Sequence, residues 1–462
     1  MTVPASGELS LGKIRQELET SDYSAGPYTT NATSLSGSET GLYAVINTNS
    51  PSYPNGTAPF AMSEWYSYNH AAVAASFSTP ITISFTTNTV PWTNYDRMDD
   101  TIWITAYGHE YGSTSESLDL KIVDTGDNST IASTTLTYAP GSSGSPSQRK
   151  AFDVCTIGTG SAAFGMYNNS SRDVSGFIFK DGGSLTTSTI NASNWLYSPR
   201  VYYGGYHGSD HYFVGVGNGT NNNGPTAQIV RVNTALTSIT ELSSSPIQPF
   251  IDLFNRWNDG VFLNTSGSTL YFLYLYDRGF TQTVVRASVI EIDTSTNTVS
   301  TPLTNTSFIT SVSVGYGIHN PGFGVNIADN YAIVPIYMGA GNTRLHLIKW
   351  DPGSTALTVE DTYDLSSDFG ADVNLNPIDS GSFELNQSLD KLLITAPSGS
   401  VTTLATLNFT TSSITSVTNL VEIASSAYSY TKAGVTSTSS NLAFVSFGAD
   451  NKPQTWSGSG YL

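Results

Sequence analysis

The chain has 462 residues and carries 18 lysines and arginines against 36 aspartates and glutamates, for a formal net charge of −18 at pH 7. Charged residues make up only 12% of the chain, about half of their usual share, and Ser, Thr, Asn, Gly and Tyr fill the gap. This composition suits pleated strands and polar turns, and it excludes a long helical bundle or a coiled coil. The acidic balance disfavours nucleic acid and anionic membrane as partners, because both are bound through clustered Lys and Arg.

The single cysteine, Cys155, excludes an intrachain disulfide. The first 20 residues lack the basic start and apolar core of a secretory signal, and no run approaches the roughly 18 apolar residues of a membrane span. No defined metal-site spacing is present: His207 and His211 flank a glycine-rich turn, and His109-Glu110 has Ser113 where a zinc protease has its second histidine. We therefore expect no metal, no cofactor and no membrane insertion.

The first part of the chain, residues 1–79, carries two short helical patterns. Ser10 can cap a helix, and apolar residues follow it at helical spacing; a second short helix is predicted over 61–69. Residues 22–59 are rich in Ser, Thr, Gly, Pro and Asn, which is typical of a linker or extended arm. Because helices this short cannot bury their apolar side chains internally, we expect an attachment module whose contact residues are Leu11, Ile14, Leu18, Trp65 and Tyr66.

The second part, residues 80–192, is predicted to be a β-sandwich or jelly roll. Six or more short strands alternate or run apolar, over 81–85, 101–105, 118–123, 130–136, 162–167 and 176–179. Turn clusters at 124–129 and 141–146 separate them. Short strands at this spacing are typical of two packed antiparallel sheets.

The third part, residues 193–462, contains an internal repeat. An apolar strand recurs around positions 213, 272, 333, 393 and 444, at intervals of 59, 61, 60 and 51 residues. A second apolar strand, a turn and a Thr-rich strand follow, as over 289–299, and a shorter inner strand comes before the recurring one. Four strands per unit predict β-propeller blades. We count five blades, or six if 164–179 belongs to the ring, and we expect residues 194–197 to supply the outer strand that closes it.

The sequence offers no defensible catalytic group, so we expect the chain not to be an enzyme. There is no Gly-x-Ser-x-Gly and no phosphate-binding loop. A glycoside hydrolase would need two placed carboxylates, yet most candidates stand in turns, where Asp is favoured by local hydrogen bonds. These candidates are Asp252, Asp259, Asp277, Glu291, Asp329, Asp379 and Glu384. A carbohydrate-active propeller enzyme remains the alternative interpretation.

Aromatic residues make up 11% of the chain, and some of them fall in predicted propeller loops. Core packing on strands accounts for most tyrosines, but exposed Tyr stacks on sugar rings or anchors an interface at low entropic cost. These loops carry Tyr, Asn, Gly and Ser with little charge, which favours a neutral saccharide ligand. The candidate ligand surface is Tyr202, Tyr203, Tyr206, His207, Asn222, Arg278 and Phe280.

The segment SGELSLGKIRQEL at 6–18, followed by AMSEWY at 61–66, resembles a module at the start of virion structural and tail proteins of tailed bacteriophages. There, a Ser-Leu-x-x-Ile-Arg-x-Glu segment is followed by Ser-x-x-Tyr; here residues 19–60 separate the two. The resemblance covers about 20 residues and implies a structural protein on the virion that is made in the host cytoplasm. It implies an external tail fibre, tail tip or similar appendage whose partners are other virion proteins, copies of itself and a host-surface glycan. A purely architectural capsid or neck decoration is the alternative in that setting.

Overall fold

The computed structural model divides the chain into two compact units, Met1–Ser78 with Gly458–Leu462, and Thr79–Ser457. It describes residues 10–20, 23, 34, 38, 54, 61–66, 68, 76–77, 81–82, 91–97, 102–109, 116–124, 129–138, 152–158, 161–168, 174–191, 197–218, 225–242, 258–265, 267–277, 285–309, 324–339, 342–365, 382–385, 391–398, 401–424, 428–435, 441–447 and 453–459. Strands dominate this part of the chain, so the prediction of an all-β protein is confirmed.

The N-terminal unit contains both predicted helices, α1 (Leu11–Thr20) and the 3-10 helix η1 (Met62–Trp65). The backbone N–H of Ile14 donates to the Ser10 carbonyl at 2.9 Å, so the first helical turn begins where the sequence predicts it. Neither described helix is long and apolar enough to cross a membrane.

The two helices share a small apolar core, although their shortness led us to expect that their apolar side chains stay exposed. Ile14, Leu18 and Trp65 are buried together with Tyr23 and Tyr68, and the rings of Trp65 and Tyr68 meet edge to face at 5.1 Å. The prediction that such short helices cannot bury their apolar residues is therefore wrong, because each helix covers the other.

Within residues 76–459, the described strands form seven antiparallel sheets. Six of them contain four strands in chain order. The first three are built from β3 (Pro91–Arg97), β4 (Ile102–His109), β5 (Glu116–Asp124) and β6 (Ser129–Tyr138); β7 (Phe152–Ile157), β8 (Ala162–Asn168), β9 (Val174–Lys180) and β10 (Leu185–Asn191); and β11 (Tyr197–His207), β12 (Asp210–Asn218), β13 (Pro225–Asn233) and β14 (Ile239–Glu241).

The next three sheets repeat this order. They are built from β15 (Asn258–Asn264), β16 (Thr269–Asp277), β17 (Val285–Asp293) and β18 (Thr298–Ile309); β19 (Val325–Ala328), β20 (Tyr331–Gly339), β21 (Asn342–Lys349) and β22 (Thr358–Asp364); and β23 (Ser382–Leu385), β24 (Lys391–Ser398), β25 (Val401–Phe409) and β26 (Ile414–Ala424). The seventh combines β27 (Tyr428–Val435), β28 (Asn441–Phe447) and β29 (Pro453–Ser459) with β1 (Ser76–Phe77) and β2 (Ile81–Thr82).

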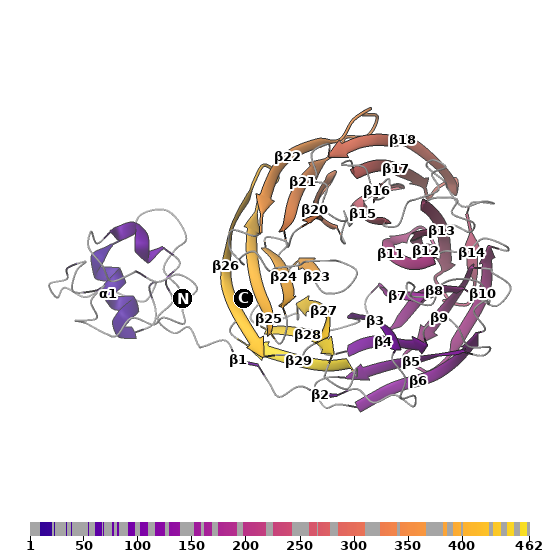
Figure 1. Ribbon diagram of the computed structural model, residues 1–462, viewed down its shortest axis with the longest axis horizontal. Coiled ribbons are helices and arrows are strands. Elements are labelled where there is room, and N and C mark those ends of the chain that lie inside the picture. The colour runs from indigo at the N-terminus through magenta and orange to yellow at the C-terminus, as the bar shows by residue number, and fades with distance from the viewer. Residues whose placement is uncertain are drawn as a thin grey trace. The chain divides into compact units, whose positions relative to one another are not determined.

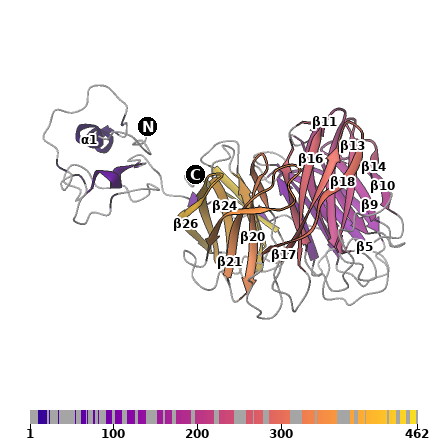
Figure 2. The same cartoon turned by 90° about the horizontal axis from the view of Figure 1, so that it is seen from above.

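Neighbouring sheets pack face to face, and each apolar core joins one sheet to the next in the chain. Phe164 of β8 and Phe213 of β12, for example, lie with their rings 4.4 Å apart. Equivalent cores join the first six sheets in series, and β27 contacts both β3 and β24, which completes the circle. Figure 1 shows the result: a ring in which β3, β7, β11, β15, β23 and β27 lie toward the centre. Seen edge-on, the strands run between the two faces of the ring (Figure 2). This is the architecture of a β-propeller.

The structure changes two details of the predicted architecture. Residues 80–192 do not form a sandwich beside the ring; their strands β3–β6 and β7–β10 are two further sheets of the same four-stranded pattern, so seven sheets stand where five blades were predicted. The closing strands also differ: β1 and β2 pair with β29, through Ser76 with Ser459 and Ile81 with Thr455. The residue at 197, which we expected in the closing segment, begins β11 instead.

Two glycines leave room for a phenylalanine ring from the neighbouring strand of the same sheet. A Cβ added to Gly165 of β8 would stand 2.2 Å from Phe177 Cζ and 2.6 Å from the Asp153 carbonyl oxygen. A Cβ at Gly260 of β15 would likewise stand 2.2 Å from Phe272 Cζ. In both places a phenylalanine ring on the partner strand occupies the space above the glycine.

Candidate functional site

The hairpin of β11 and β12 carries most of the described part of the candidate ligand surface. Successive strand residues point to opposite faces, so Tyr202 and Tyr203 cannot share a surface. Tyr202 packs in the core toward sheet β15–β18, and Tyr203 in the core toward sheet β7–β10. The pairing of β11 with β12 shifts register between Tyr203 and Gly205, and Gly205 has a φ of 103°. This shift changes which face of the sheet the side chains after Gly205 point to, including that of Tyr206.

Tyr202 links two sheets and is partly buried between them. Its hydroxyl accepts a hydrogen bond from the Gly260 N–H of β15 at 3.1 Å, and its ring lies 5.1 Å from that of Phe272. The next sheet therefore covers part of this side chain, and its contact with a ligand stays a prediction.

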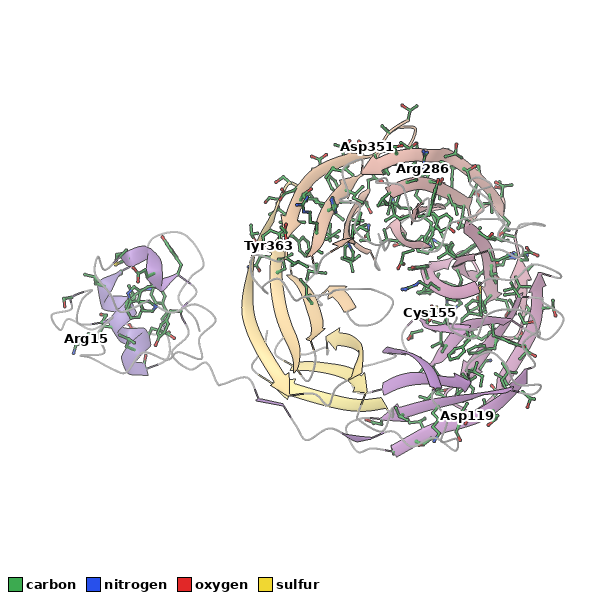
Figure 3. The ribbon with its side chains drawn as sticks, viewed as in Figure 1. Arg15, Asp119, Cys155, Arg286, Asp351 and Tyr363 are labelled. Carbon is green, nitrogen blue, oxygen red and sulfur yellow. The ribbon has the colours of Figure 1, made fainter. Side chains whose placement is uncertain are left out.

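Tyr203 is half-buried and forms a hydrogen-bonded pair with His211. Their Oη and Nδ1 atoms lie 2.9 Å apart, and the ring packs 5.2 Å from Phe213. Burial, with the nearby Cys155 thiol, raises the pKa of Tyr203 to about 12, although a hydrogen bond with the Gly158 backbone opposes the shift. Burial also lowers the pKa of His211. Both groups are therefore neutral near pH 7. Figure 3 labels Cys155 on the neighbouring sheet.

Tyr206 is the exposed member of the predicted surface, with 51% of its surface accessible. Its ring lies 5.0 Å from the His211 ring, and its hydroxyl lies 3.4 Å from the Thr234 hydroxyl. His207 points to the other face, where its Nε2 donates to the Gly204 carbonyl at 3.1 Å and its ring meets Tyr212. Asn222, Arg278 and Phe280 lie outside the described residues.

The two histidines flanking the turn therefore lie on opposite faces of the sheet. Asp210, between them, pairs with Arg231 at 3.1 Å. In the part of the chain that the structure describes, no group of three or more His, Cys, Asp or Glu residues could hold a metal ion.

A buried charged cluster joins the inner strands of three successive sheets. Asp153 of β7 accepts a hydrogen bond from the Val201 N–H of β11 at 2.7 Å. Arg200 of β11 places Nη1 3.2 Å from Oδ2 of Asp259, on β15. The Gly260 N–H donates to the other oxygen of Asp259 at 2.9 Å. These contacts hold the innermost strands together at one end of the ring.

The pKa of Asp259 suits an acid catalyst, but its side chain has no contact with solvent. Its side chain is completely buried, and burial raises its pKa to about 7 despite the opposing effect of Arg200. A carboxyl group that holds its proton near neutral pH is suited to general acid chemistry. No substrate atom reaches a side chain with no exposed surface, so here the group serves packing.

The other carboxylates of the predicted set do not complete a pair with Asp259. Glu291 lies partly buried on β17; burial, and secondly the charge of Glu291, raise the pKa of Tyr271. Asp329 is exposed in the turn between β19 and β20. The side chains of Asp252, Asp277, Asp379 and Glu384 lie outside the described residues. Sequence reasoning missed the role of Arg200, whose only signal is its position just after the start of an inner strand.

The predicted attachment residues divide into two sets. Ile14, Leu18 and Trp65 are buried inside the N-terminal unit and are corrected to core residues. Leu11 and Tyr66 are partly exposed. Lys13 is also partly exposed, and its Nζ lies 5.5 Å from the centre of the Tyr23 ring. The partly exposed members of the set thus lie at the start of α1 and directly after η1.

No protein-family model and no curated protein matches the chain. Among solved structures, it is similar to the β-propeller domain of the Trilobed protease from Pyrococcus furiosus, with 9% identity over 80% of this chain and 96% of that one, at a TM-score of 0.41. A protein from Lactobacillus plantarum shows 10% identity over 70% and 82%, at 0.42. A mutant of the apocarotenoid oxygenase of Synechocystis shows 10% identity over 56% of this chain and only 58% of its own length, at 0.31. At identities this low, the comparisons concern the fold and not the function.

Proposed function

We propose that the chain is a non-enzymatic structural protein of a tailed-bacteriophage virion, in an external tail fibre, tail tip or similar appendage. Its N-terminal unit attaches it to the particle, and its propeller binds a host-surface ligand. The observation that carries the proposal is the shared core of α1 and η1. The two segments that resemble the phage module are separated in sequence by residues 19–60, yet they pack as one body.

The attachment surface of this proposal is the partly exposed side of the unit, with Leu11, Lys13 and Tyr66 as contact residues. Their mixture of apolar and basic groups suits a docking partner that offers an apolar groove rimmed by carboxylates. The buried residues Ile14 and Trp65 shape this surface indirectly, by fixing the angle between the two helices. We propose that other virion proteins and further copies of this chain are the partners.

The proposal is tested by removing residues 1–75, which leaves the closing strands β1 and β2 in place. In a system that assembles the particles, tagged full-length and truncated chains are expressed separately, and gradient-purified particles are assayed by immunoblot. We expect the truncated chain to stay folded by circular dichroism and to be absent from particles. A Leu11→Asp, Tyr66→Asp double variant of the full chain should reduce incorporation, while Val359→Asp on the outer strand β22 serves as the control. Particles that contain the truncated chain at the full-length level would refute the attachment assignment.

A carbohydrate-active enzyme is the second candidate. Asp259, whose pKa is raised to about 7, would be its acid only if the ring opens to expose a side chain that is completely buried in the folded chain. Its test is the release of reducing ends from bacterial surface polysaccharide. We expect none. Release that disappears in Asp259→Asn would replace the binding proposal with an enzymatic one.

A further inference from the structure

We propose that Tyr206, His211 and the Gly158 turn form a subsite for one neutral pyranose ring, with the apolar face of the sugar stacked on Tyr206. This inference rests on the proposed host-surface binding and names the ligand class and the contact residues. The subsite lies where the β7–β8 turn of one sheet meets the β11–β12 hairpin of the next.

Tyr206 supplies a stacking surface that is already held in place. Among the described side chains, only three large hydrophobic residues are exposed, and Tyr206 is the aromatic one; the others are Ile131 and Val359. The contacts of Tyr206 with His211 and Thr234 hold its ring in place, while 51% of the residue stays exposed. A ring that is fixed before binding loses little conformational entropy when a ligand stacks on it.

His211 supplies a hydrogen-bonding group beside that ring. Its Nδ1 lies 2.9 Å from the Tyr203 hydroxyl, and the two groups share a hydrogen bond. The imidazole is half-buried, so Tyr203 holds the ring in place and its Nε2 is the nitrogen left for a ligand. A sugar hydroxyl both donates and accepts, so it can pair with a neutral imidazole nitrogen of either kind.

Gly158 keeps the subsite open. The residue is exposed in the β7–β8 turn, with φ +58°, and a Cβ added there would stand 3.8 Å from Tyr203 Oη and 3.9 Å from His211 Cε1. A longer side chain at this position would extend over the Tyr203–His211 pair. Glycine therefore serves both the left-handed turn and access to the imidazole.

The charges around the subsite favour a neutral ligand. Asp210 and Arg231 neutralise each other on the opposite face of the sheet. Lys180, which donates to the Ala235 carbonyl at 2.9 Å, is followed in the chain by the oppositely charged Asp181. One exposed aromatic ring is also far smaller than the roughly 800 Å² per partner of a stable protein interface, so a sugar ring fits the platform better than a second protein does.

The test uses the full-length chain and saturation-transfer NMR with the methyl glycosides of glucose, galactose, mannose, N-acetylglucosamine and rhamnose, and with methyl glucuronide as the charged counterpart. We expect at least one neutral glycoside to bind saturably and more tightly than the glucuronide. Tyr206→Ala should weaken that binding by about tenfold, Tyr206→Phe should keep it within about twofold, and the control Ile131→Ala should not change it.

Three outcomes overturn the subsite: no neutral glycoside binds, binding is equal in Tyr206→Ala, or Tyr206 instead drives self-association in sedimentation experiments. Failure here is distinguishable from failure of the proposed function, because Tyr206→Ala should enter particles at the wild-type level. If the full-length chain enters particles but binds no sugar, the subsite proposal alone is refuted. If it binds sugar but does not enter particles, the virion proposal alone is refuted.

Discussion

Replacing Asp259 with asparagine should change how stability depends on pH. Burial raises the pKa of this carboxyl group from 3.8 to about 7, so the folded chain keeps a proton that the unfolded chain releases at lower pH. Its contribution to stability is thus complete below the unfolded pKa and is lost as the pH rises through the folded one. By linkage, the wild type loses about 2.5 kcal/mol between pH 5 and pH 8 from this group, and Asp259→Asn does not.

The assay is urea unfolding of both proteins at pH 5, 6, 7 and 8, followed by tryptophan fluorescence. His346, whose burial lowers its pKa to about 4, gives the opposite slope in both proteins, so the informative quantity is the difference between variant and wild type at each pH. That difference should shift in favour of the variant as the pH rises. Asp293→Asn is the matched control, because hydrogen bonds from Ser295 and Thr296 lower the pKa of Asp293 to about 2, outside the range. A constant difference for Asp259→Asn would refute the buried, protonated carboxyl.

Three further substitutions test the packing. Gly165→Ala places a methyl group against Phe177 and the Asp153 backbone and should cost about 1–3 kcal/mol in urea unfolding, whereas Gly182→Ala, with open space around it, should be nearly neutral; equal effects would contradict the close approach of β8 and β9. Trp65→Ala should unfold the N-terminal unit and leave the main melting transition of the propeller unchanged by calorimetry, with Tyr66→Ala as the milder comparison; loss of the propeller transition would disprove the independence of the unit. Tyr212→Phe removes a hydroxyl that donates toward the Thr294 carbonyl and Asn297 of the next sheet, at 3.1 and 2.9 Å, and should lower unfolding free energy by about 1 kcal/mol; no change would exclude this hydrogen bond as a link between the sheets.

The propeller repeat could be predicted because its second strands are apolar on both faces. Phe213, Phe272 and Ile333 fall on β12, β16 and β20, each in the interior of its sheet. A strand buried on both sides is a strong pattern in sequence. The hairpins also repeat: the N–H groups of Thr234 and Thr294 donate to the carbonyls of Ser209 and Ser268 in successive sheets.

The first two sheets and the ring closure could not be predicted in the same way. A strand of a sandwich and a strand of a blade alternate identically, because the pattern records burial and not which sheet lies opposite. The closing strands β1 and β2 contain two residues each, too few to show any period. Their pairing with β29 joins residues from opposite ends of the chain, which local patterns do not record.

The ligand surface shows a similar division. A cluster of tyrosines was visible in the sequence, but their directions depend on the register shift after Tyr203 and on the sheets to either side. Tyr202 and Tyr203 face neighbouring sheets, and Tyr206 escapes burial because it stands near the end of its strand. The burial of the attachment residues also depends on contacts between distant segments. The sequence predicts that Ile14 and Trp65 are exposed, because each lies on a short helix, and the contact between α1 and η1 buries both.

The virion role is tested most directly by locating the protein on purified particles by cryo-electron microscopy, with mass spectrometry to confirm its presence. We expect copies at symmetric positions, with the N-terminal unit in contact with other virion proteins and the ring exposed on the outside. Particles that lack the protein, or that hold it through the ring with the N-terminal unit projecting freely, would contradict it.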